Sequence, residues 1–234
     1  MTKILLALIL LITVFSLVVW VDYIYRFSLG QEENSLLAYI LTSGEYLLNL
    51  VTKENTLQEY KPADLVELAD LGAPGKYLRR PAHDNLAALL KGAKNDRVNL
   101  KILSAWRSYF YQKSLFSFFS RKYKNAASFS AEAGHSEHQL GTTIDFGAGD
   151  SKTDLNINFA QTPPGKWLEQ NAFKYGFVMS YPAGKEAITG YIYEPWHYRY
   201  IGVEAAREFY NSGLTLQEFL TQKPQHYQEE LPLE

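Results

Sequence analysis

The chain opens with one uninterrupted apolar run. The eighteen residues from Ile4 to Val21 carry no charge, and as a helix they would extend ~27 Å, close to the hydrocarbon thickness of a bilayer. Lys3 before the run favours a cytoplasmic N-terminus, and Trp20 would lie at the far interface. The pattern predicts a membrane anchor over residues 1–26, with the rest of the chain outside the cytoplasm. A cleaved secretory signal and a buried core helix are the alternatives.

The rest of the chain has the patterning of one domain. No repeat of fixed period and no long Pro/Gly-rich linker divides it. Residues 27–45 are interpreted as a juxtamembrane segment, 46–221 as the domain and 222–234 as an acidic tail. Apolar periodicity predicts helices over 83–96, 108–124, 165–175 and 203–212, and strands over 46–52, 99–105, 142–146 and 191–193. Without regular βαβ alternation, we expect an α+β fold with helices packed on a mainly antiparallel sheet.

Composition narrows the chemistry that this domain can perform. Hydrophobic residues make up 47% of the chain and charged residues 21%, values typical of a globular protein. The formal net charge of -2 leaves no cationic excess for a run of phosphates, so nucleic acid is not an expected partner. Because there is no cysteine, disulfides, thiolate zinc sites and a cysteine nucleophile are excluded.

The candidate metal ligands lie in two polar segments. His138 and Asp145 belong to the first segment and His197 to the second. Two imidazoles and one carboxylate form a three-ligand set for zinc that leaves a fourth position for water. In a continuous strand His138 and Asp145 would point to opposite faces, so we expect Gly141 to supply a bend between them. The alternative is purely structural: a surface histidine, a turn-capping aspartate and a half-buried histidine.

Two further charged residues complete the candidate site. Glu194 precedes His197 by three positions, and Pro195 breaks the strand between them, so the two side chains can meet. A carboxylate beside a zinc site is a candidate general base. Arg107 follows the predicted strand 99–105 and could stabilise negative charge on an attacked carbonyl.

Other catalytic patterns do not occur in the sequence. No serine is followed by lysine three positions later, which excludes the Ser-x-x-Lys signature. The segment from Gly134 to His138 places histidine where a nucleophile elbow needs its second glycine. A His-Glu-x-x-His helix is also missing.

The two polar segments resemble a known family. Ser136-x-His138-x-x-Gly141-x-x-x-Asp145, followed by Glu194-Pro195-Trp196-His197, is similar to the zinc D-alanyl-D-alanine carboxypeptidases of the VanY/LdcB type. The resemblance extends from about Tyr46 to Gly202 and includes Tyr60 to Val66, Ser104 to Ser108 with Gln112, Tyr175 to Phe177, Tyr181 to Glu186, Thr189 to Tyr191 and Trp196 to Gly202.

The resemblance implies an α+β zinc-peptidase domain that holds one Zn2+ ion and trims D-alanine from the ends of peptidoglycan stem peptides. It implies zinc ligation by His138, Asp145 and His197, with Glu194 as the base. Arg107 matches an arginine that stabilises the oxyanion or the substrate carboxylate. The positions that match the family's substrate pocket are Gln112, Ser136 and Tyr181.

Several alternatives stay open beside this resemblance. Family members cut either D,D or L,D bonds, and an endopeptidase or dipeptidase could use the same site. A non-catalytic wall-binding module is a further alternative. Departures from the family pattern, which remove neither a ligand nor the base, are Ala133, Trp106 and the pair Thr142-Thr143.

Overall fold

The computed structural model describes residues 45–223. The predicted anchor over 1–26, the juxtamembrane segment up to residue 44 and the tail beyond residue 223 lie outside these described residues. Across the described range, no helix combines the length and the apolar character needed to cross a bilayer. Within the described range, the residues from Leu47 belong to one compact unit.

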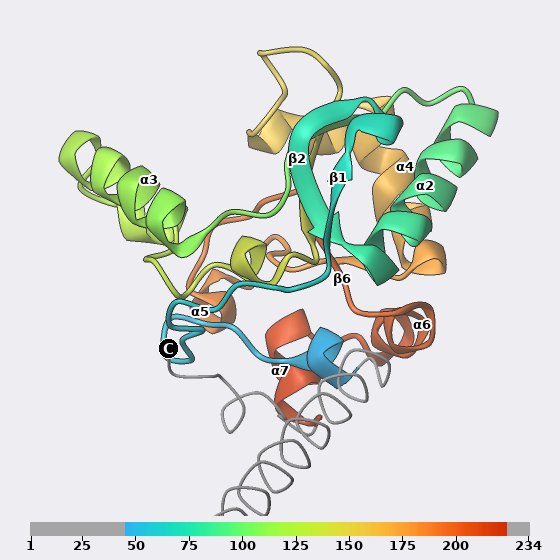
Figure 1. Cartoon of the computed structure of the whole chain (residues 1–234). Helices are drawn as coiled ribbons and strands as arrows, with labels where there is room; N and C mark the ends of the chain where they lie inside the picture. The colour runs from blue at the N-terminus through green and yellow to red at the C-terminus, as the bar shows by residue number, and fades with distance from the viewer. Residues whose placement is uncertain (1–44, 224–234) are drawn as a thin grey trace, which may run out of the picture. The chain divides into compact units, whose positions relative to one another are not determined.

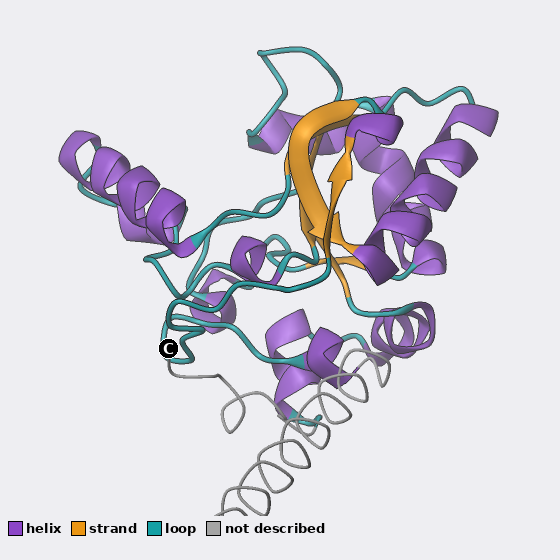
Figure 2. Cartoon of the chain, in the orientation of Figure 1, coloured by secondary structure: helices purple, strands orange, loops and turns teal. Residues whose placement is uncertain are grey.

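The larger sheet of this unit has four antiparallel strands, and Figure 2 shows the strands gathered between the helices. Its strands, in spatial order, are β3 (Lys101–Ser104), β4 (Thr143–Gly147), β6 (His197–Tyr200) and β5 (Phe177–Met179). A separate antiparallel pair is formed by β1 (Leu65–Leu68) and β2 (Ala73–Arg79). In the register of β4 and β6, Asp145 lies opposite His197. The sheet therefore brings together two residues that are far apart in sequence.

Helices surround the two sheets, and α2 and α4 lie on the same side of the β1–β2 pair in Figure 1. Helix α2 buries Leu86, Leu89 and Ala93 on one face and has a proline in its first turn. Side-chain caps start α3, α4 and α7, at Ser108, Thr162 and Thr215. The helices are α2 (Arg80–Asn95), α3 (Tyr109–Lys122), α4 (Pro163–Asn171), α5 (Glu186–Thr189), α6 (Val203–Ser212) and α7 (Leu216–Thr221).

The mixed helix and antiparallel-sheet fold expected from the sequence is confirmed. The four predicted helices correspond to α2, α3, α4 with the 3-10 turn Ala172–Tyr175, and α6. The strands predicted over 99–105 and 142–146 correspond to β3 and β4. The sequence patterns did not reveal β1, β2, β5 or β6, which are short or lack clear alternation.

The strand predicted over 46–52 is wrong. Glu45–Leu48 form a 3-10 turn, and no strand follows before Thr52. The buried guanidinium of Arg199 explains the difference, because its Nη2 donates to the carbonyls of Leu47 (3.0 Å) and Asn49 (2.5 Å). These carbonyls are satisfied by a side chain and not by a neighbouring strand.

The strand predicted over 191–193 is also wrong, because the strand begins later, at His197. The preceding backbone is paired with loops: Ile192 N donates to Ser128 O at 2.8 Å, and Glu194 N donates to Tyr181 O at 3.0 Å. Pro195, which has no N–H, separates this extended segment from β6.

Phe146 is expected to be a major source of stability in the sheet. Its side chain is fully buried and meets the rings of Tyr198 and Phe177 at centroid distances of 5.8 and 6.5 Å. Phe146→Ala should lower the free energy of unfolding by about 3–5 kcal/mol, because it leaves a cavity in a packed core. Denaturant unfolding measures this. Phe110→Ala, at a side chain that is 64% exposed, should change stability by less than ~0.5 kcal/mol. Equal effects of the two variants would contradict the assigned packing.

Candidate metal centre and active site

Three short elements position the predicted ligands. His138 lies in the 3-10 turn Glu137–Leu140, Asp145 in the middle of β4, and His197 at the start of β6. Gly141 ends the turn with φ of 74°, and a Cβ at this position would lie 3.0 Å from packed side chains. The bend expected at Gly141 is confirmed, and only glycine fits it without strain.

The structure brings His138, Asp145 and His197 to one point. One donor atom from each lies within 4.8 Å of the other two, and all three residues are buried. His138 Nε2 is 3.2 Å from Asp145 Oδ2, and His197 Nδ1 is 3.3 Å from Asp145 Oδ1. Two ligands on a tetrahedral zinc ion are separated by about 3.3 Å, given bond lengths near 2 Å. Asp145 Oδ1 is also buried without a hydrogen-bond partner among the described residues, so the donor set fits zinc.

Hydrogen bonds on the outer side of each imidazole select the nitrogen that faces the centre. His138 Nδ1 lies 2.6 Å from the carbonyl oxygen of Ala105 and donates to it, which leaves the Nε2 lone pair for a metal. His197 Nε2 lies 2.9 Å from Glu137 Oε2 and donates to this carboxylate, which leaves Nδ1. Such partners orient metal-bound histidines and raise their basicity.

The pKa values of the two histidines differ because their neighbours differ. Burial, together with the nearby Arg107 guanidinium, lowers the pKa of His138 to about 4, so this imidazole is neutral, as a ligand must be. Burial also acts to lower the pKa of His197, but the carboxylates of Asp145 and Glu137 beside its two ring nitrogens outweigh it and raise the pKa to about 10. Zinc binding would therefore release a proton from His197.

Arg107 contacts the ligand set directly. Its Nη2 donates to Asp145 Oδ2 at 2.7 Å and lies 3.0 Å from His138 Nε2. Ser104 and Gln112 hold the guanidinium: Nε donates to Ser104 Oγ at 3.1 Å, and Nη1 donates to Gln112 Oε1 at 3.3 Å. A positive charge therefore lies at the centre, held by side chains of β3 and α3.

Glu194 lies beside the ligand set, where a general base would be needed. Its Oε2 is 3.6 Å from His197 Nδ1. Burial raises the pKa of Glu194 to about 8, although the nearby His197 acts in the opposite direction. A zinc ion would lower this pKa towards neutrality, the range in which a carboxylate exchanges protons efficiently.

The three predicted pocket residues take different positions. Gln112 is fully buried and not solvent-facing, and its Nε2 donates to Ala131 O at 2.7 Å. Ser136 is buried at the start of the turn that carries His138. The Tyr181 ring packs against His197 at a centroid distance of 4.7 Å. All three thus lie near the centre, and their contact with substrate stays a prediction.

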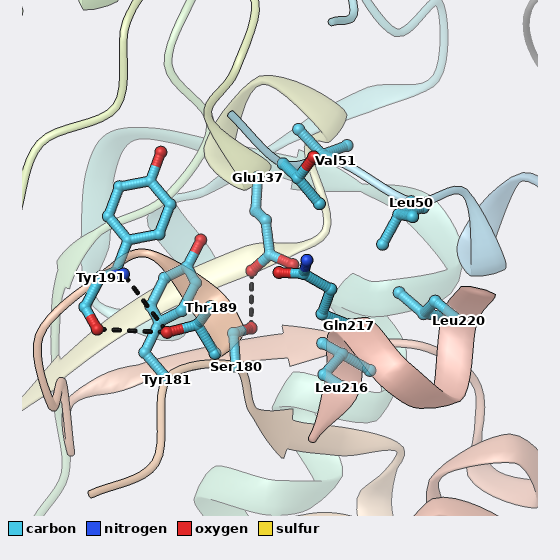
Figure 3. Close-up of a pocket in the computed structure, with 11 residues that line it drawn as sticks. Leu50, Val51, Glu137, Ser180, Tyr181, Thr189, Tyr191, Leu216, Gln217 and Leu220 are labelled. Carbon is cyan, nitrogen blue, oxygen red and sulfur yellow. Dashed lines mark hydrogen bonds between the residues drawn. The ribbon is translucent and has the colours of Figure 1, made fainter. Parts of the chain in front are cut away.

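Sequence reasoning missed the buried carboxylate of Glu137. Its oxygens accept hydrogen bonds from Ser180 Oγ at 2.6 Å, His197 Nε2 at 2.9 Å and Arg199 Nη1 at 3.0 Å. Burial acts to raise the pKa of Glu137, but Arg199 and His197 lower it to about 2. Figure 3 shows this carboxylate inside a pocket that also contains Gln217. The available signal was its position next to His138, but no local pattern indicates its distant partners.

Glu137→Gln should weaken zinc binding and destabilise the domain. The amide loses the charge that orients His197 and leaves Arg199 as an uncompensated buried cation. We expect zinc affinity to fall ~10–100-fold and the free energy of unfolding to fall by about 3–5 kcal/mol. Competition with a zinc chelator and denaturant unfolding measure these. The matched control is Glu132→Gln, an exposed carboxylate of the same type. Wild-type zinc affinity in Glu137→Gln would contradict the role of Glu137.

Together, the buried two-histidine, one-aspartate set, the adjacent carboxylate and the α+β domain define a zinc metallopeptidase. The family model described as VanY, D-alanyl-D-alanine carboxypeptidase, matches residues 75–203. The chain belongs to this VanY family. It is 38% identical over 187 residues to the putative carboxypeptidase YodJ of Bacillus subtilis, covering 75% of this chain and 67% of YodJ. A D-alanyl-D-alanine carboxypeptidase of Enterococcus faecalis is 32% identical over 187 residues, covering 75% of this chain and 66% of that protein.

Solved structures of related enzymes have the same fold. The LdcB LD-carboxypeptidase aligns with a TM-score of 0.69 and 35% identity, covering 79% of this chain and 90% of LdcB. A mutant of the D,D-pentapeptidase VanY in complex with Zn(II) aligns with a TM-score of 0.63 and 30% identity, covering 75% of this chain and 99% of that chain. VanYB in complex with D-alanine-D-alanine aligns with a TM-score of 0.64 and 29% identity, covering 77% of this chain and 100% of that chain. The zinc expected from the sequence is the metal of the second structure. The chain spans about two thirds of the length of the two curated relatives.

Proposed function

We propose that this protein is a zinc-dependent D-alanyl-D-alanine carboxypeptidase that removes the terminal D-alanine from peptidoglycan stem peptides. The observation that carries the proposal is the convergence of His138, Asp145 and His197, with Glu194 3.6 Å from His197. Membership of the VanY family and the D-alanine-D-alanine bound by VanYB support the substrate class.

His138, Asp145 and His197 would hold the metal. When bound, zinc makes water nucleophilic near neutral pH and polarises the scissile carbonyl. Glu194 accepts a proton from the attacking water and returns it to the departing amine of D-alanine. Arg107 Nη2 contacts His138 Nε2 and Asp145 Oδ2, atoms that would face the metal. Displaced from them, its guanidinium would be available for negative charge on the substrate.

Product identification tests the bond that is cut. Stem pentapeptides ending in D-Ala-D-Ala and tetrapeptides ending in a single D-alanine are incubated separately with the zinc-loaded protein, and the products are weighed. The proposal expects loss of one alanine from the pentapeptide. Preferential trimming of the tetrapeptide would support the L,D-carboxypeptidase alternative, which the similarity to LdcB favours. Release of a dipeptide or an internal cut would contradict both.

Arg107 should give the enzyme a preference for a free terminal carboxylate. A charge-assisted hydrogen bond contributes about 1.5–3 kcal/mol, so a peptide ending in an amide should show kcat/KM lowered ~10–100-fold. In Arg107→Met, the ratio of kcat/KM for the peptide acid to kcat/KM for the peptide amide should fall close to one. Because each variant is compared with itself on two substrates, altered zinc content cancels. An unchanged ratio would assign Arg107 to the oxyanion and not to the carboxylate.

We also propose that residues 1–26 anchor the chain in the cell membrane as a single pass, with the domain outside the cytoplasm. The uncharged run from Ile4 to Val21 supports this placement. The anchored protein should resist carbonate extraction and be degraded by protease added to wall-stripped, sealed cells. Recovery of a shortened protein in the medium would favour a cleaved signal.

A further inference from the structure

Helix α3 and its flank differ in composition from the rest of the chain. Residues 109–125 contain seven aromatic residues, four basic residues and no acidic residue. No acidic residue occurs anywhere from 97 to 131, although the whole chain has a net charge of -2. Aromatic residues interleaved with lysine and arginine are typical of segments that lie at a membrane interface.

Three aromatic side chains of α3 point outward. Phe110, Tyr111 and Phe118 are 64%, 58% and 52% exposed, and Tyr123 just beyond the helix is 41% exposed. At 100° per residue, Phe110, Tyr111 and Phe118 share one face. The opposite face is held to the domain by Gln112 and by Phe119, whose ring meets that of Phe129 at 5.4 Å. In Figure 1, α3 extends away from the sheet. Exposed aromatic side chains gathered on one helix face indicate an interaction surface.

The basic side chains around this face are available for a partner. Within residues 45–223, none of the four forms an ion pair, and Lys122 only lies over the Tyr123 ring at 5.3 Å. Arg121 and Lys122 lie in the last turn, and Lys113 lies one turn after Phe110. A partner for this surface therefore needs apolar depth together with negative charge, which an anionic bilayer interface provides.

We propose that the exposed face of α3 is a docking surface that rests on an anionic lipid bilayer. The proposal rests on the membrane placement proposed above, because an anchor in the preceding 44 residues keeps the domain near the lipid. Tethering makes docking intramolecular, so a modest affinity suffices. Since Gln112 of the first turn of α3 bonds Arg107, docking would fix the height of the active site above the membrane.

The absence of cysteine allows a direct test in the full-length chain. A nitroxide is attached to Ser114→Cys, on the exposed face of α3, or to Ser151→Cys, an exposed position in a loop. The labelled chains are reconstituted in vesicles of phosphatidylcholine with or without phosphatidylglycerol. Power saturation with a water-soluble nickel chelate then reports immersion. We expect the label at Ser114 to become protected in the anionic vesicles, less so at high salt, and the label at Ser151 to stay accessible.

Charge variants test the electrostatic part. Each basic residue near an anionic surface contributes about 1 kcal/mol, or about fivefold, so Arg121→Gln with Lys122→Gln should lower the docked-to-undocked ratio about 25-fold. The matched control is Lys91→Gln with Lys94→Gln, two exposed lysines of α2, which should leave immersion unchanged. Turnover of a soluble peptide should be the same in both variants.

Other outcomes would overturn the proposal. A label at Ser114 that stays accessible in a membrane-bound chain refutes docking. Protection by isolated peptidoglycan and not by lipid would assign the surface to the wall, and spin–spin broadening at rising protein density would assign it to a second copy. Flotation with neutral vesicles at high salt tests membrane anchoring separately, and peptide hydrolysis tests the enzymatic activity. If the chain fails the flotation test or the hydrolysis test but its Ser114 label is immersed in anionic vesicles, the docking surface on α3 is still supported.

Discussion

Glu194→Gln is expected to lower kcat about 10²–10⁴-fold while one zinc ion stays bound, because the variant loses proton transfer and keeps the metal ligands. The side chain keeps its size, and none of the donor atoms of His138, Asp145 or His197 is changed. The raised pKa of Glu194, about 8, reflects burial of the carboxylate. An amide at this position cannot take a proton from water. Turnover of stem peptide and zinc content, measured on the same preparation, check this prediction.

The control for this variant is Glu186→Gln, an exposed carboxylate in the same half of the chain. It should keep both zinc and full activity. If Glu194→Gln retains wild-type turnover, the base has been assigned to the wrong residue. If it loses zinc, Glu194 acts as a ligand and the three-residue set is incomplete.

Asp145→Asn should abolish both zinc binding and turnover. Asp145 touches each of the other two predicted ligands, at 3.2 and 3.3 Å, and it is the only carboxylate in the set. A neutral amide oxygen is a poor zinc ligand. We therefore expect zinc affinity to fall further than the ~10–100-fold that is typical when a residue hydrogen-bonded to a ligand is changed. Chelator competition and elemental analysis measure the loss.

An isosteric control separates ligand loss from general damage. Asp150→Asn changes an exposed aspartate five residues away and should bind zinc normally. Unfolding curves of Asp145→Asn identify any folding defect. Retention of tight zinc binding by a folded Asp145→Asn protein would show that the metal lies elsewhere.

The parts of the fold that could be predicted are those with a long, one-sided apolar pattern. Helix α2 buries Leu86, Leu89 and Ala93 at helical spacing, and α6 was predicted with its observed bounds. Strand β6 could not be recognised because it is only four residues long and its polar residues, His197 and Arg199, are buried against the distant Glu137. The residues from Leu47 to Asn49 resemble a strand in composition, but their carbonyls bond Arg199 and no strand.

The candidate site likewise contains residues that the sequence pattern indicates and one, Glu137, that it does not. His138, Asp145, His197 and Glu194 were found because unusual polar residues stand out in apolar surroundings. Glu137 resembles a surface residue in the sequence, and its partner Arg199 lies 62 positions later. Only the pairing of strands puts them together, so no local pattern could have revealed the carboxylate that orients His197.

The most direct test of the metal centre is a crystal structure of the zinc-loaded protein with anomalous data collected at the zinc edge. We expect one anomalous peak about 2 Å from His138 Nε2, a carboxylate oxygen of Asp145 and His197 Nδ1. A peak at other residues, or none in protein that hydrolyses stem peptides, would contradict it.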